Sequence, residues 1–261
     1  MKSKSIIICL LTMIFSSCTY GVYQVYKVVP DSNIVQKENN LVYEDNNCKI
    51  IYDLWSEGGD IGFLLYNKTS SNIYLNVEES FFIVNGIAYN YFKNRTFSNS
   101  SNQAIALTYK YSSFNSNNMT SIGETTSRIE EKIIIIPPSS GKYLREYKIQ
   151  EEEFKNCDFV DELGNSKKSK TLIFDKSNSP IKCSNKIKYT VGKNGQDIDI
   201  ENSFYISEIS NCPAEEITDL IYKNKCGRTD QFLTEQFKNP SPNKFYIKLT
   251  SINKGYIYPI K

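Results

Sequence analysis

Residues 81–92 read FFIVNGIAYNYF, and this stretch decides the fold class of the chain. Two runs of aromatic, β-branched and other β-prone residues, 81–84 and 87–92, flank the dipeptide Asn85-Gly86. Both residues of that dipeptide tolerate positive φ, which the tight turn of a two-stranded hairpin requires. The stretch therefore predicts two antiparallel strands joined by a two-residue turn.

Similar short runs lie on both sides of this hairpin, separated by residues that favour turns, so the protein is expected to be mainly β. The composition agrees, because 19 Tyr and 14 Phe together with many Ile and Val suit a pleated, half-buried backbone. The other expected strands are 22–29, 41–44, 48–55, 61–66, 73–77, 133–136, 142–149, 171–174, 186–191, 203–209 and 244–249.

One short helix is expected near the C-terminus, over residues 213–222. It would begin at Pro213, which suits the first turn of a helix, with Glu215 and Glu216 near the positive end of the helix dipole. Apolar residues further along would share one face of this helix.

The expected strands group into a first β-sandwich over 18–149, after residues 1–17, and a C-terminal β-rich region over 171–261. From Leu41 to Ile149, the order of strands, with an Asn67-Lys68-Thr69 turn in the middle and a Pro137-Pro138 turn late, resembles the immunoglobulin-like sandwiches of many exported bacterial proteins. A charged stretch without apolar periodicity, 150–170, is the candidate boundary. Whether the second group extends the first sandwich or forms its own is open at this point.

The segment 98–127 loses the apolar alternation and is rich in Ser, Asn and Thr, so we expect a long exposed loop. Aromatic residues in such a loop are good contact residues for a partner. Here they are Tyr109, Tyr111 and Phe114. The alternative is that 105–111 forms another strand.

Residues 1–17 have the form of a signal peptide. Two lysines precede an apolar run over 6–15 that is too short to span a bilayer, and the pair Ser16-Ser17 comes directly before Cys18. The pattern resembles a bacterial lipoprotein signal, which implies cleavage between Ser17 and Cys18 and attachment of lipid to the Cys18 sulfur. The alternatives are an ordinary secretory signal cut elsewhere and an uncleaved membrane anchor.

The composition argues against several classes of function. The chain has no histidine, which removes the commonest general base, the histidine-dependent nucleophile pairs and imidazole zinc sites. Loss of Lys2 and Lys4 with residues 1–17 leaves 29 basic residues against 29 acidic ones. Nucleic acid is therefore not an expected partner, because phosphate binding needs a basic excess on one face. No phosphate-binding loop or nucleophile elbow is present, and no catalytic residue, cofactor or metal is predicted.

Five cysteines follow Cys18, and in an exported protein a disulfide is expected among them. The predicted pair is Cys212 with Cys226, which would close a short segment. An odd number leaves at least one unpaired, and without a histidine to activate it such a cysteine is expected to be a small buried side chain.

Acidic residues crowd the stretch 150–170, and a carboxylate-based hydrolase would need two of them across a cleft. Carboxylates in such a charged run are normally solvated. The single tryptophan, Trp55, is expected either in the core of the sandwich or on a rim that faces a ligand.

The mature chain as a whole also resembles uncharacterised Bacteroidota-type lipoproteins. The stretches that carry this resemblance are Tyr43-Glu44-Asp45, the turn over 55–60, Asn67-Lys68-Thr69, Asn85-Gly86 and Cys226-Gly227-Arg228. The resemblance implies no reaction. Since residues 19–26 contain no acidic residue, it implies the outer membrane of the cell envelope, with the protein facing the periplasm.

Three functional hypotheses follow. The first is a non-catalytic, lipid-anchored structural or interaction module that contacts the membrane through its lipid and holds another envelope protein. The second is a sugar- or peptide-binding module, which would need exposed Tyr or Trp along a groove. The third is the carboxylate-based hydrolase. The sequence identifies no small-molecule ligand.

Overall fold

A computed structural model describes residues 21–108, 117–156, 169–224 and 231–249 of the chain, without the side chains of 98–127 and of residue 231. The hairpin predicted from residues 81–92 is present in it. Asn85 and Gly86 have φ values of 48° and 84°, and they join β6 (Ile73–Val84) to β7 (Ile87–Asn90). Turn chemistry that is local in the sequence therefore sets this part of the fold.

The larger sheet has eight strands, all of them paired antiparallel. Along its main path lie β10 (Ile133–Ile136), β6, β13 (Lys182–Val191), β14 (Ile198–Pro213), β1 (Val22–Pro30) and β17 (Lys244–Leu249), while β7 pairs with β6 and β12 (Lys170–Ile173) pairs with β14.

The smaller sheet has five antiparallel strands, all of them between residues 34 and 144. Its spatial order is β11 (Gly141–Leu144), β5 (Phe63–Asn67), β4 (Cys48–Tyr52), β3 (Asn40–Glu44) and β2 (Ile34–Lys37). Asp45 holds the turn between β3 and β4, because its carboxylate accepts the backbone N–H groups of Asn47 and Cys48 at 2.8 and 2.7 Å. This is the hairpin expected around residues 45–47.

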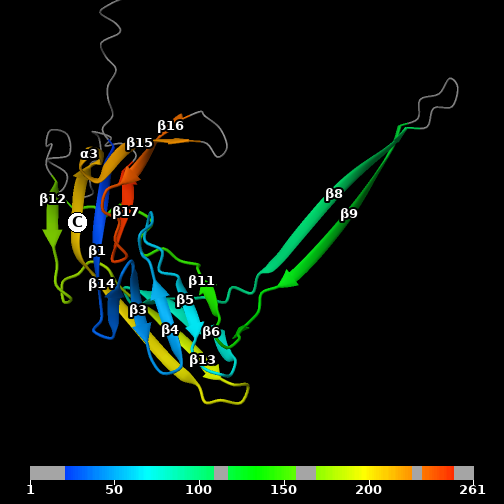
Figure 1. Ribbon diagram of the computed structural model, residues 1–261, viewed down its shortest axis with the longest axis horizontal. Coiled ribbons are helices and arrows are strands. Elements are labelled where there is room, and N and C mark those ends of the chain that lie inside the picture. The colour runs from blue at the N-terminus through cyan, green and yellow to red at the C-terminus, as the bar shows by residue number, and fades with distance from the viewer. Residues whose placement is uncertain (1–20, 109–116, 157–168, 225–230, 250–261) are drawn as a thin grey trace, which may run out of the picture.

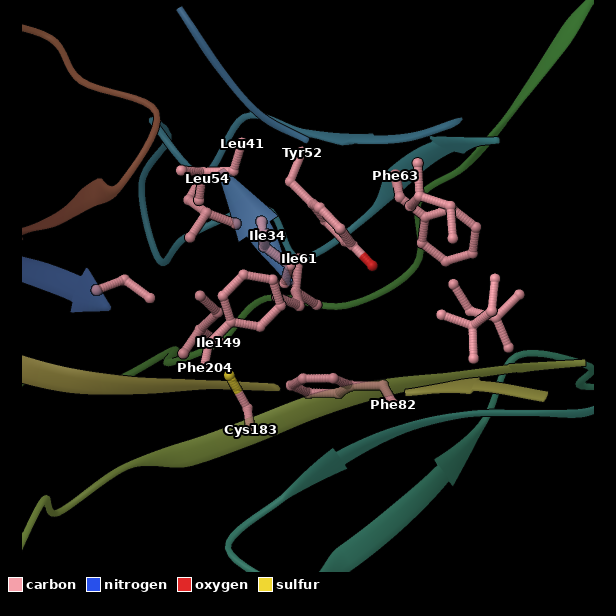
Figure 2. Packing of buried hydrophobic residues seen from close by; sticks show 14 of the residues in the cluster. Ile34, Leu41, Tyr52, Leu54, Ile61, Phe63, Phe82, Ile149, Cys183 and Phe204 are labelled. Carbon is pink, nitrogen blue, oxygen red and sulfur yellow. The ribbon is translucent and has the colours of Figure 1, made fainter. Parts of the chain in front are cut away.

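The two sheets pack face to face as a β-sandwich with one continuous core. Alternate residues of β5 are buried and half-buried, as the period of a strand requires. The ring centre of Tyr52 on β4 lies 5.2 Å from that of Phe204 on β14, which joins the sheets. Figure 2 shows side chains of the two layers pointing toward one another, among them Tyr52, Phe82 and Phe204.

Several buried polar side chains in this core form hydrogen bonds, and among the described residues the Asn202 Oδ1 is the buried side-chain atom without a partner. The Asn202 amide nitrogen on β14 donates to the Tyr52 hydroxyl at 2.8 Å. On β13, Asn185 accepts from the Tyr91 hydroxyl at 2.7 Å and donates to the carbonyl of Ile61 at 2.9 Å. Such bonds matter because a buried polar group without a partner costs free energy.

The two halves of the chain share one sheet. Strand β1 lies between β14 and β17, and β13 lies between β6 and β14. The ranges 18–149 and 171–261 therefore do not have separate cores, and the C-terminal strands extend the first sandwich. The connector is tied to the body as well, because the Phe154 N–H is donated to the Gln24 side chain at 2.6 Å.

The predicted helix is present but much shorter than expected. Helix α3 covers Ala214–Ile217, and the chain then continues as β15 (Thr218–Asn224), paired with β16 (Gln231–Phe237). A single turn of helix gains few hydrogen bonds for the residues that it fixes, whereas strand pairing satisfies the whole segment. The apolar residues Leu220, Ile221 and Tyr222 thus belong to a hairpin rather than to a helix face.

Candidate interaction site at the base of the arm

A long two-stranded hairpin projects from the sandwich (Figure 1). We call it the arm; it consists of β8 (Thr96–Thr108) and β9 (Asn117–Ile129), paired without interruption from Thr96 with Ile129 to Thr108 with Asn117. At about 3.3 Å per residue, the paired strands extend about 40 Å.

The arm corrects the expectation of a long exposed loop over 98–127. Neither strand belongs to one of the large sheets, but each satisfies the backbone groups of the other. A polar sequence can therefore form regular strands here without a core of its own. The alternative of a strand over 105–111 agrees with the structure up to Thr108, and the remaining residues lie outside the described part.

The base of the arm is held to the body by a group of charged side chains. The Arg95 guanidinium donates to the Glu130 carboxylate, with Nε at 3.2 Å, and to Glu146 at 2.9 Å. Glu130 also accepts the backbone N–H groups of Lys93 and Arg95 at 2.9 and 3.0 Å. The Lys93 ammonium lies 2.8 Å from Glu146. Four charges thus bind the two ends of the arm to the segment that follows β11.

These contacts also set the protonation of the group. Partial burial raises the pKa of Glu130, but hydrogen bonds from Arg95 and from the backbone outweigh it, so the pKa lies below its usual value. The hydrogen bond to Glu130 raises the pKa of Arg95, and the one to Glu146 raises the pKa of Lys93. Glu130, Arg95 and Lys93 therefore stay charged at neutral pH.

A pocket of about 180 Å³ opens beside this group of charges. Its apolar lining is buried or half-buried and consists of Val77, Tyr91, Ile134 and Leu144. Its charged lining is Arg95, Arg128, Glu130, Glu131 and Lys142. Phe97 completes the lining and is 44% exposed, with the Arg95 and Arg128 guanidinium carbons 5.5 and 5.7 Å from its ring centre.

This combination suits the binding of a side chain from another molecule. The Phe97 ring lies close to two guanidinium groups, and aromatic and arginine side chains dominate the energy of protein interfaces. A second pocket, of about 250 Å³, lies near the end of β1. There Lys176 pairs with Asp31 at 2.7 Å. We take the pocket with the exposed ring as the candidate site.

The residues predicted as contact and anchor sites lie outside the described part of the chain. Tyr109, Tyr111 and Phe114 fall between β8 and β9, and Ser17 and Cys18 precede residue 21. Their roles stay predictions.

Cys212 lies near the end of β14. Like Cys48 and Cys183, it is buried and forms no disulfide among the described residues. Its predicted partner Cys226 is not described, so that disulfide also stays a prediction. Burial raises the pKa of Cys48 and of Cys183 to about 12, which fits the expectation of inert, buried thiols.

Trp55 lies outside the main core cluster. It is half-buried, and its ring centre is 5.0 Å from Phe237 on β16 and 5.3 Å from Tyr246 on β17. The structure therefore places Trp55 where the hairpin of β15 and β16 meets the body, and not in the centre of the sandwich core.

The carboxylates considered for hydrolysis do not form a recognisable pair in the described part of the chain. Glu151 and Glu152 are exposed, and Asp158, Asp161 and Glu162 lie outside the described residues. At the arm base, Glu130 and Glu146 both pair with Arg95, and Glu79 and Asp197 likewise both pair with Lys188, so each of these carboxylates has a basic partner. No group of three or more acidic or cysteine side chains with metal-binding geometry occurs among the described residues.

The residues that build the site were not singled out in the sequence. Arg95 and Glu130 stand at the two ends of the Ser/Asn/Thr-rich segment, and opposite charges at both ends of a polar segment were the available signal. Their partner Glu146 carries no comparable mark, because it approaches only through the tertiary fold.

No helix in the described ranges is long and apolar enough to cross a membrane. Comparisons with protein-family models, with curated proteins and with solved structures found no match to this chain.

Proposed function

We propose that this protein is a non-catalytic, lipid-anchored module of the cell envelope that holds another envelope protein at the base of its arm. The observation that carries the proposal is the fixed arm base, where paired charges hold Phe97 beside a pocket. The anchor is Cys18, which follows the signal-like residues 1–17.

The electrostatics of the site favour binding over acid catalysis. A general acid at neutral pH needs a carboxyl group with a raised pKa, as burial in an apolar pocket provides. The pKa of Glu130 is lowered instead, and both of its oxygens are engaged by Arg95 and the backbone. These contacts keep the geometry of the arm base rigid, which reduces the entropy lost when a partner binds.

The pocket defines the chemistry of the partner. Its buried floor accepts an apolar side chain, and Arg128 and Lys142 at its edge favour an acidic residue beside that side chain. We therefore expect a protein segment with an aliphatic or aromatic residue next to Asp or Glu.

The partner site is tested by cross-linking in intact cells followed by purification in detergent. Phe97→Ser should abolish the recovery of a partner that the unchanged protein captures. The matched control is Tyr143→Ser, since Tyr143 is 59% exposed but lies on β11 and does not line the pocket. Equal recovery with Phe97→Ser and with the control would reject this site.

The anchor is tested separately by mass spectrometry of the mature N-terminus. The unchanged protein should begin at Cys18 and carry acyl chains, whereas Cys18→Ser should lose both the lipid and membrane retention. A Cys18→Ser protein that stays in the membrane fraction contradicts the anchor.

A further inference from the structure

The second free-standing hairpin, β15 with β16, exposes large apolar side chains. We call it the ribbon; it pairs Thr218 with Phe237 at its base and Asn224 with Gln231 at its far end, and it belongs to neither large sheet. Leu220, Tyr222, Phe232 and Leu233 are 65, 71, 43 and 51% exposed. An isolated two-stranded hairpin is marginally stable in water, so these side chains are expected to be covered by something.

The apolar side chains cover both faces of the ribbon. Tyr222 pairs with Leu233, so their side chains lie on one face, and Leu220 is two residues away on the same face. Phe232 pairs with Lys223 on the other face. A partner surface that contacts only one face of the ribbon would leave Phe232 in water. A lipid layer can instead contact both faces at the outer end of the ribbon.

The ribbon stands at the end of the body where β1 begins. The Ala214 N–H donates to the carbonyl of Gly21 at 2.9 Å, directly before the ribbon. The Tyr23 hydroxyl donates to Glu235 on β16 at 2.7 Å. Figure 1 shows the ribbon extending sideways from this end of the sandwich.

The chain between the proposed anchor, Cys18, and the start of β1 is short, so this end of the body lies close to the membrane. Cys18 precedes Val22, the first residue of β1, by four residues, which span at most about 14 Å when fully extended. We propose that the ribbon inserts its outer apolar side chains into the headgroup region of the bilayer that holds the anchor; this inference rests on the proposed lipid on Cys18.

The side-chain chemistry fits a lipid surface. Tyrosine and phenylalanine place an apolar ring at the level of the headgroups, and exposed lysine near them favours anionic lipid. Tyr222 and Phe232 supply the rings, and Lys223 supplies an exposed ammonium group. Contact through the ribbon would fix the orientation of the body relative to the bilayer, which attachment at Cys18 alone does not.

The test measures whether the ribbon enters the bilayer. The full lipidated protein is placed in vesicles of phosphatidylethanolamine and phosphatidylglycerol that contain brominated phospholipids, which quench tryptophan on contact. Trp55→Phe removes the natural tryptophan, and Tyr222→Trp then places a single probe on the ribbon. We expect strong quenching of this probe.

The matched control places the probe at Ile87, which is 58% exposed. Successive strand pairs place Ile87 level with Pro30, at the far end of β1. Pro30 follows Val22 by eight residues, so this level is about 26 Å along β1 from the end that is near the anchor. Ile87→Trp should remain unquenched. Adding Leu220→Ser and Leu233→Ser to the ribbon probe should reduce its quenching severalfold, whereas adding Ile173→Ser, on β12, should not.

The outcomes separate the ribbon from the anchor. A lipidated, vesicle-bound protein whose ribbon probe is quenched no more than the Ile87→Trp probe overturns the ribbon inference and leaves the anchor intact. A vesicle-bound protein whose ribbon probe is unquenched at every protein density, and whose two ribbons cross-link to each other, shows that a second copy covers the ribbon, which also overturns the inference. Absence of lipid from the mature protein overturns the anchor and, with it, the inference.

Discussion

Removal of the Glu130 carboxylate should release the base of the arm while the sandwich stays folded. Glu130 accepts two backbone N–H bonds, from Lys93 at 2.9 Å and from Arg95 at 3.0 Å, and it binds the Arg95 guanidinium. In Glu130→Ala all of these donors lose this acceptor, although the backbone N–H of residue 130 still reaches the Arg95 carbonyl.

The size of the effect follows from the exposure of the group. A hydrogen bond to a charged group contributes about 1.5–3 kcal/mol when it is shielded from water. The Glu130 side chain is 12% exposed, but that of Arg95 is 39% exposed, so water can replace part of what the guanidinium loses. We therefore expect a local loss of about 2 kcal/mol, which corresponds to an opening about 30-fold more frequent.

Amide hydrogen exchange measures this opening directly. The amides of Lys93 and Arg95 should exchange about 30-fold faster in Glu130→Ala, while amides of the central strand β13 should be unchanged. The control is Glu131→Ala, which removes an exposed neighbouring carboxylate from the same pocket. Unchanged exchange at Lys93 and Arg95, or an equal effect of both variants, would refute the role assigned to Glu130.

The same contact should depend on pH. Because the pKa of Glu130 is lower in the folded protein than in an unfolded chain, its contribution is fully present above the unfolded value of about 4.3. The contribution is lost as the pH falls through the lower, folded value. Protection of the Lys93 and Arg95 amides should therefore decrease in acid more than protection of β13, and this difference should disappear in Glu130→Ala.

Two further substitutions test the sandwich itself. Gly59→Ala should lower the free energy of unfolding by more than Gly86→Ala does. Both glycines have positive φ, but a Cβ at Gly59 would lie 2.8 Å from the Phe245 ring, whereas no atom lies within 4 Å of a Cβ at Gly86. Equal melting temperatures of the two variants would contradict this packing. Tyr52→Phe should cost about 1–3 kcal/mol, since it leaves the buried Asn202 amide without its acceptor. A thermal shift of roughly 2–12 °C is expected for a chain of this size, and an unchanged melting temperature would exclude that hydrogen bond.

Much of the fold was readable from short stretches of sequence. Asn85-Gly86 predicts its own turn, and most of the expected strands appear, because turn preference and alternation of apolar residues depend on neighbouring residues. The strand over 22–29 is present as β1, but its pairing with β14 and β17 was not predictable. Those partners lie about 180 or more residues further along the chain, and any of several strands of similar pattern satisfies the local signal.

The site was less accessible to sequence reasoning than the strands were. The segment 98–127 has too few apolar residues to predict a strand. Its two strands nevertheless pair, because each satisfies the backbone hydrogen-bonding groups of the other. The predicted aromatic contacts remain untested, and the site that the structure describes consists of residues at the other end of the arm.

The amino-acid sequence by itself determined that the protein is mainly β, where its tight turns fall and which residues alternate between core and solvent. Only the tertiary structure decided that both halves share one sheet, and that Arg95 meets both Glu130 and Glu146. Turns and alternation arise from interactions between near neighbours. Strand order and ion pairing depend on which distant surfaces bury the most area together once the entropy of closing long loops has been overcome.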